Sequence, residues 1–275
     1  MEYAVIFIIG SVIGSFLNVC IHRIPIGSSI VFPPSQCPRC GSRVKAIDNI
    51  PIVSYILLRG RCRDCREVIS PRYPLVECLN GLLYALIAWR FGIGGSGIFY
   101  MAFTSALIVI TFIDLDHQII PDSITLPGIV VGLLFASLPS IWNAAMTAEV
   151  PAALRSISLV DPYNRSQEMG FLRSLMGMAI GGGLFLAIAA ISRGGMGGGD
   201  IKMMGMMGSV LGWKGVLMTT FAASLTGSII GILLMIFRGK GRKSKIPFGP
   251  FLALGGMLSL LFGEELVGIY LRGTT

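Results

Sequence analysis

Two aspartates stand beside long hydrophobic segments, and their side chains are the strongest candidates for chemistry in this chain. Asp114 lies in Phe112-Ile113-Asp114-Leu115-Asp116, and Asp200 follows Gly197-Gly198-Gly199. A carboxylate at mid-bilayer costs roughly 2.5–3.5 kcal/mol or more, so acids in membrane segments are rare and usually functional. Two adjacent carboxyl groups share one proton, so one can deprotonate water while the other polarises a peptide carbonyl. The two aspartates therefore predict aspartic-protease chemistry at one cavity.

Other polar side chains near these aspartates have different expected roles. Asp116 is about 200° from Asp114 around a continuing helix, so both cannot point into one site. Asp122 is expected to help cap the next helix. Lys202 is expected either to act on the Asp200 carboxylate or to extend toward the membrane interface. The motif Pro247-Phe248-Gly249-Pro250 should break the helix there and form one wall of the same cavity.

Four cysteines form a second group that can do chemistry. They occur as Cys37-Pro-Arg-Cys40 and Cys62-Arg-Asp-Cys65, with 21 residues between the two pairs. Two such pairs predict four thiolates around a tetrahedral Zn²⁺, although the gap slightly exceeds the usual ribbon spacing. Disulfides are the alternative, and a reducing cytoplasm disfavours them. Because the ligand set is complete, we expect a structural zinc that folds a loop with few apolar residues.

The elements that must position these residues are membrane helices. Hydrophobic residues make up 53% of the 275 positions, charged residues only 13%, and the mean hydropathy is +0.77. A soluble domain carries about 25% charge, so the composition predicts an all-α polytopic membrane protein. Apolar runs of suitable length predict eight transmembrane helices. The predicted spans are 4–21, 75–91, 97–115, 123–142, 172–192, 199–213, 215–237 and 248–270.

The distribution of basic residues predicts how the chain is oriented in the membrane. Segment 23–73 holds nine Lys and Arg against three acids, and 238–245 holds five with no acid. Both should be cytoplasmic by the positive-inside rule, which places both termini in the periplasm. The net charge of +8 then reflects topology and affinity for anionic lipid, and it requires no nucleic acid.

The chain is expected to fall into three parts. Residues 1–22 form a first transmembrane helix, 23–74 a cytoplasmic zinc-binding loop, and 75–275 a transmembrane core that carries a periplasmic insertion near 143–170.

Small and polar residues near the loop predict helix contacts. Gly10 and Gly14 should let the first helix approach a neighbour closely. Glu77 enters a span and is expected to pair with Arg72 or Arg23.

The ordered motifs of this chain resemble those of the bacterial type IV prepilin leader peptidases, and the likeness covers nearly its whole length. It rests on Gly14–Pro25, the four cysteines, Asn49–Ser54, Arg59–Cys62, Pro71–Glu77, Asp114–Asp122, Gly197–Gly208 and Pro247–Pro250.

The resemblance implies a membrane aspartic endopeptidase with a glycine-x-glycine-aspartate active site in the bacterial inner membrane. It makes Asp114 and Asp200 the catalytic pair, and the aspartate-to-proline spacing to Pro121 selects Asp114 over Asp116. Such enzymes cleave prepilins and pseudopilins of type IV pilus and type II secretion systems after a glycine, at the cytoplasmic face. They then N-methylate the new terminal residue, usually phenylalanine, with S-adenosylmethionine.

The methyltransferase half has no readable motif of its own. No nucleotide-type G-x-G-x-x-G follows a strand, so the contacts of S-adenosylmethionine cannot be named from the sequence. The four-cysteine loop indicates the bifunctional branch of the family, and the methyl donor is expected near this loop.

Three other functions fit parts of the sequence. A transporter could use the aspartates as an ion site, but the halves show no inverted repeat. A lipid-linked transferase could bind a divalent metal through Asp114 and Asp116, and His117 with Asp114 could form a weaker metal-ligand pair. A zinc-loop scaffold of a secretion machine would need neither aspartate.

Overall fold

The computed structural model describes residues 1–137, 170–192, 196–238 and 247–272. Most of the predicted insertion at 143–170 and of the basic stretch at 238–245 lies outside these residues. Contacts divide the chain into two compact units, Met1–Ile113 and Asp114–Thr275. The described residues are almost all helical outside the cysteine loop, and their β-structure is limited to two isolated bridges. The predicted all-α fold is confirmed.

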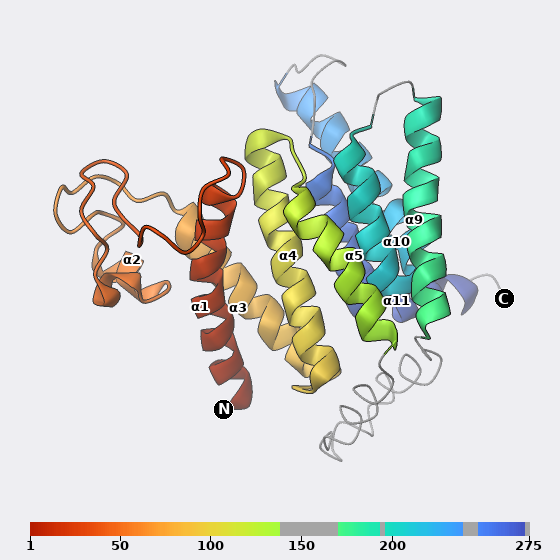
Figure 1. Cartoon of the computed structure of the whole chain (residues 1–275), viewed down its shortest axis with the longest axis horizontal. Coiled ribbons are helices and arrows are strands. Elements are labelled where there is room, and N and C mark those ends of the chain that lie inside the picture. Colours follow the sequence, from red (N-terminus) through yellow and green to blue (C-terminus); the bar gives the residue numbers. More distant parts are fainter. Residues whose placement is uncertain (138–169, 193–195, 239–246, 273–275) are drawn as a thin grey trace. The chain divides into compact units, whose positions relative to one another are not determined.

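The helices coincide with the predicted spans (Figure 1). They are α1 (Glu2–Arg23), α3 (Arg72–Phe91), α4 (Gly95–His117), α5 (Asp122–Ser137), α9 (Phe171–Ile191), α10 (Gly198–Arg238) and α11 (Gly249–Arg272). The long α10 covers the sixth and seventh predicted spans, and it is divided at Gly212, whose φ of 70° is not helical. Among the described residues, four helices are long and apolar enough to cross a membrane: α1, α4, α9 and α10. The number of eight spans remains a prediction.

In the first unit, α1 and α3 pack closely because glycines face each other. A Cβ atom at Gly10 would lie 2.9 Å from the Cα of Gly81, and one at Gly14 would lie 2.7 Å from the Cα of Glu77. These distances are shorter than any real Cβ contact, so only glycine permits the approach. The predicted close contact of the first helix is confirmed.

A buried chain of polar side chains ties α1, α3 and α4 together. Asn80 donates to the carbonyl of Gly10 at 2.7 Å and accepts from the hydroxyl of Ser105 at 3.0 Å. The hydroxyl of Tyr84 lies 3.0 Å from that of Ser105. Because each buried polar group has a partner, this network positions α3, which carries one wall of the cysteine loop.

In the second unit, α9 packs along the first part of α10 (Figure 1). A Cβ atom at Gly177 would lie 2.2 Å from the carbonyl oxygen of Gly208, so the two backbones touch. Four methionines of α10 face the interior and are at most 1% exposed: Met203, Met204, Met206 and Met207. The Met-rich segment is therefore a core element whose first turn carries Asp200.

Candidate functional site

Asp114 lies near the C-terminal end of α4, within the second unit, and only 5% of its surface is exposed. Its Oδ2 accepts a 2.8 Å hydrogen bond from the backbone N–H of Gly249, the first residue of α11. A Cβ atom at position 249 would lie 2.7 Å from that oxygen. Glycine at this position is therefore what allows the start of α11 to hold the Asp114 carboxyl group.

Asp200 lies in the first turn of α10 and is half-buried. Its Oδ2 accepts a hydrogen bond from the backbone N–H of Gly197 at 3.2 Å, while its own N–H donates to the carbonyl of Gly197 at 3.2 Å. This reciprocal pair satisfies a free donor at the helix start, as in a capping box. Gly199, which directly precedes Asp200, has a packing role, because a Cβ atom there would lie 2.8 Å from the Cβ of Ile120.

Asp114 and Asp200 both lie in the second unit, close enough for the charge of one carboxyl group to act on the other. Each uses Oδ2 to accept an N–H from a glycine, Gly249 for one and Gly197 for the other. Two carboxyl groups in this arrangement can activate water between them without a metal or a nucleophilic side chain.

The neighbouring charged residues are placed differently. Asp116 is exposed at the end of α4. Lys202 donates to Asp122 at 2.6 Å, so it pairs with the first residue of α5. The structure therefore gives Lys202 a partner that sequence analysis did not foresee. In the described part of the chain, the cysteines are the only group of three or more His, Cys, Asp or Glu side chains that could hold a metal.

The four cysteines Cys37, Cys40, Cys62 and Cys65 meet in the first unit, and their sulfur atoms all lie within 4.8 Å of one another. All of them are free thiols, so the disulfide alternative is wrong for this structure. A zinc ion with Zn–S bonds of about 2.3 Å in tetrahedral geometry needs sulfur atoms about 3.8 Å apart. The Sγ atoms of Cys37 and Cys65 are 3.8 Å apart, which fits such a site.

The two cysteine turns share one backbone design. The N–H of Cys37 donates to the backbone carbonyl of Ser42 at 2.9 Å, and the N–H of Cys62 donates to the backbone carbonyl of Glu67 at 2.8 Å. Each turn is closed by an isolated bridge, Gln36 with Arg43 and Arg61 with Val68. Each of the two turns contributes two sulfur atoms, and the four sulfur atoms surround one point.

Hydrogen bonds favour the thiolate forms that a metal requires. The side-chain hydroxyl and backbone N–H of Ser42 lower the pKa of Cys40 to about 6. Backbone N–H groups of Cys65 and Asp64 lower the pKa of Cys62 as well. The pKa of Cys65 is raised to about 12 by burial and by its hydrogen bonds with the other three thiols. Four thiols this close cannot all ionise easily without a cation, and thiolates are the form that binds metal.

A strained turn beside this loop holds Glu77. Ile52 has φ 61° and ψ −52°, and the N–H of Val53 donates to the carbonyl of Pro51 at 2.5 Å, which makes a γ-turn. Such a conformation costs about 1–3 kcal/mol for a branched side chain. It aims the N–H of Ile52 at Oε2 of Glu77, 2.8 Å away. The strained turn therefore lies at the point where its backbone N–H holds the buried carboxyl group of Glu77.

The expected cationic partners of Glu77 lie elsewhere. Arg72 donates to the carbonyl of Phe112 at 3.0 Å and stacks 4.6 Å from the centre of its ring. Arg23 donates to the loop carbonyls of Ser29 and Pro33. The predicted pairing of Glu77 with either arginine is not seen, because backbone carbonyls and an aromatic ring compete for the guanidinium groups.

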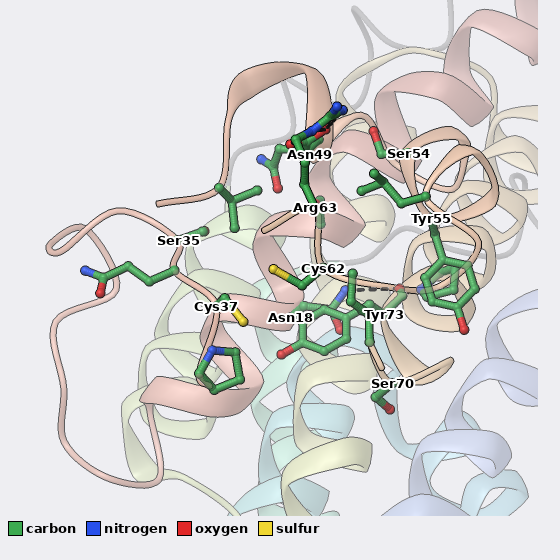
Figure 2. Close-up of a pocket in the computed structure, with 18 of the residues that line it drawn as sticks. Asn18, Ser35, Cys37, Asn49, Ser54, Tyr55, Cys62, Arg63, Ser70 and Tyr73 are labelled. Atoms are coloured by element: carbon green, nitrogen blue, oxygen red, sulfur yellow. Dashed lines mark hydrogen bonds and ion pairs between the residues drawn. The ribbon is translucent and has the colours of Figure 1, made fainter. Parts of the chain in front are cut away.

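A cavity of about 440 Å³ lies between the cysteine turns, the end of α1 and the start of α3 (Figure 2). We call it the loop pocket. Segment 48–58, with η1 (Ala46–Asn49) and α2 (Val53–Leu57), forms another wall. Arg63 donates to both carboxyl oxygens of Asp48, with Nε 2.8 Å from Oδ2, and thus joins that wall to the second cysteine turn.

Sequence reasoning placed Pro247-Phe248-Gly249-Pro250 at the cavity of the aspartates, and the hydrogen bond from Gly249 to Asp114 agrees with that prediction. It did not identify the loop pocket or the γ-turn at Ile52. Residue types carry little signal for these features. The motif Asn49–Ser54 contains the γ-turn, but only the folded backbone shows that the N–H of Ile52 reaches the carboxyl group of Glu77.

Comparisons with known proteins agree with this architecture. The family model of the bacterial peptidase A24 N-terminal domain matches residues 8–91, and that of the type IV leader peptidase family matches residues 101–232. The comparison with solved structures found no match.

Similar curated proteins carry the name prepilin leader peptidase/N-methyltransferase. The protein of Aeromonas hydrophila is 33% identical, with 98% of this chain and 94% of the relative covered. That of Pseudomonas putida is 31% identical, with coverages of 94% and 90%. That of Myxococcus xanthus is 38% identical over 86% of this chain and 64% of the relative.

Proposed function

Because this chain belongs to the type IV leader peptidase family and is a prepilin leader peptidase and N-methyltransferase, we propose that Asp114 and Asp200 are its catalytic pair. The substrates are type IV prepilins and pseudopilins, which the enzyme cleaves after a glycine. The protein is a multi-pass protein of the inner membrane, and cleavage takes place at its cytoplasmic face. The basic loop 23–73 supports that side by the positive-inside rule.

This proposal is supported by the way each carboxyl group is held by a glycine N–H in the same unit of the chain, close enough for the charge of one carboxyl group to act on the other. One ionised carboxylate takes a proton from water, and the water oxygen attacks the carbonyl carbon of the glycine that precedes the cleaved bond. The protonated partner donates to the carbonyl oxygen. Collapse of the tetrahedral intermediate breaks the C–N bond, and the leaving amine takes the proton held by the first carboxyl group.

In the second reaction the new terminal amine, usually of phenylalanine, is methylated by S-adenosylmethionine. When bound, S-adenosylmethionine would supply the methyl group to the amine nitrogen, with S-adenosylhomocysteine and one proton as the other products. Zn²⁺ is a structural ion of Cys37, Cys40, Cys62 and Cys65, supported by the convergence of their sulfur atoms. When bound, it would hold the two cysteine turns together and so fold the loop.

The test is a set of asparagine variants assayed with purified enzyme and a prepilin. Asp114→Asn and Asp200→Asn should each reduce leader cleavage at least 10³-fold, because neither variant can share the proton. Asp116→Asn is the matched control and should cleave within about twofold of the parent. Mass spectrometry reports leader loss and methyl addition together. Normal cleavage by either active-site variant, or equal losses in Asp114→Asn and Asp116→Asn with magnesium dependence, would show that the assignment is wrong.

A further inference from the structure

The loop pocket has the size and lining of a small-molecule site. Its volume of about 440 Å³ lies within the 300–1,000 Å³ typical of pockets for drug-sized ligands. It is lined from α1, both cysteine turns, segment 48–58 and the start of α3, and Figure 2 shows their side chains surrounding one hollow. Because Cys37 and Cys62 contribute to the lining, an ion bound by the cysteines would hold its walls in place.

At the α3 side of this pocket lies a carboxylate whose charge is not matched. Glu77 is only 7% exposed. Its partners in the described residues are neutral donors, the N–H of Ile52 at 2.8 Å and the hydroxyl of Ser15. Burying an unpaired carboxylate is unfavourable, so the site gains most from a ligand that brings a positive charge.

Two of the arginines that line the pocket bind other groups. Arg63 is bound to both carboxyl oxygens of Asp48, and Arg23 donates to two loop carbonyls. Neither guanidinium supplies the charge that would match Glu77.

An aromatic ring stands one helical turn from this carboxylate. Tyr73 and Glu77 are four residues apart on α3, so they share a face, and both line the pocket. The carbonyl of Tyr73 accepts from the Asn18 side chain at 3.1 Å, which fixes the start of α3 against α1. A ring and an acid on one face suit a ligand that has both a flat base and a cationic centre.

We infer that the loop pocket is the S-adenosylmethionine site, with Glu77 facing the sulfonium and Tyr73 stacking on the adenine. This inference rests on the proposed methyltransferase function and adds the residues that hold the donor. It places donor binding in the first unit and the aspartate pair in the second. The two activities therefore depend on different residues.

The sharpest variant is Glu77→Gln. Glutamine keeps the shape and can still accept the N–H of Ile52, but it removes the charge. Equilibrium binding to the purified full-length protein is measured with S-adenosylmethionine and, separately, with neutral S-adenosylhomocysteine. The Kd for the cationic donor should rise roughly tenfold or more, about 1.4 kcal/mol, while that for the neutral product changes less than about twofold. Glu2→Gln, at the other end of α1, is the matched control and should change neither constant.

A second variant tests whether the ring of Tyr73 stacks on the adenine. Tyr73→Leu removes the aromatic face and should raise both dissociation constants by roughly fivefold or more, because stacking does not depend on the sulfonium charge. Prepilin cleavage and zinc content, measured on the same preparations, should stay within about twofold of the parent in both variants, and these values confirm that the chain is folded.

The outcomes separate the two proposals. If the parent protein binds neither ligand, the methyl-donor function itself is wrong. If the parent binds S-adenosylmethionine but both variants bind it unchanged, the donor lies outside the loop pocket. Equal weakening of both ligands in Glu77→Gln would overturn the role of the carboxylate.

Discussion

Replacing Gly249 by alanine tests whether the start of α11 sets the position of the Asp114 carboxyl group. The added Cβ would lie 2.7 Å from Oδ2 of Asp114, which is 0.7 Å short of the 3.4 Å at which ordinary contact begins. It would also lie 3.1 Å from Cγ, so rotating one oxygen away does not relieve the clash. Either the carboxyl group or the N–H that holds it must move.

The expected effect follows from this displacement. A reacting group misplaced by about 1 Å can lose about 10²-fold in rate, because the effective concentration of a well-aligned group is lost. A shift near 0.7 Å should therefore lower kcat for leader cleavage by roughly 10- to 100-fold, or about 1.4–2.7 kcal/mol of activation free energy. KM should change less, because the substitution displaces a catalytic group and removes no side chain that could bind the substrate.

Gly198→Ala provides the matched control. A Cβ at Gly198 meets no atom within 4 Å, although Gly198 is only two residues from Asp200. This variant should cleave prepilin within about twofold of the parent. Cleavage is measured with a purified prepilin, and methylation is measured separately with a pilin whose leader has already been removed. Full cleavage activity of Gly249→Ala would refute the reasoning, and so would an equal loss of methylation, since that would indicate general misfolding.

Three further results are expected. Cys37→Ser should lower zinc content and make the loop sensitive to protease, whereas Cys78→Ser should leave both unchanged; equal zinc in the two variants would contradict the four-cysteine site. The pKa of the Cys40 thiol, about 6 without metal, is lowered further when a bound cation competes with the proton, so zinc measured after dialysis should be retained at pH 6 and fall at lower pH, and retention down to pH 4 would argue against thiolate ligands. Lys202→Gln should reduce thermal stability by less than about 1 kcal/mol and leave cleavage intact, because its exposed pair with Asp122 is solvent-screened; a large loss of cleavage would show that Lys202 acts on the active site.

Much of the architecture could be predicted because it depends on local signals. Hydrophobic runs placed the helices within a few residues, since burial of apolar side chains acts along the whole length of each segment. The break at Gly212 corresponds to the boundary between two predicted spans. The spacing of Cys37, Cys40, Cys62 and Cys65 predicted their convergence, because a metal site restricts the ligand pattern strongly.

The partners of charged groups were not predictable in the same way. Lys202 pairs with Asp122, and Glu77 accepts from the backbone of Ile52, whereas the sequence suggested other partners for both. Long charged side chains have several candidates within reach, and backbone N–H and C=O groups compete with them. Which one wins depends on how the helices pack.

The sequence by itself determined the helical class, the cysteine cluster and the identity of the two aspartates as candidates, because each follows from residue type and spacing. Only the tertiary structure decided that Gly249 holds Asp114, that a γ-turn directs Ile52 to Glu77, and that a pocket forms above this carboxylate. These contacts join residues distant in the chain. Their geometry is set by close packing of helices, which no local pattern encodes.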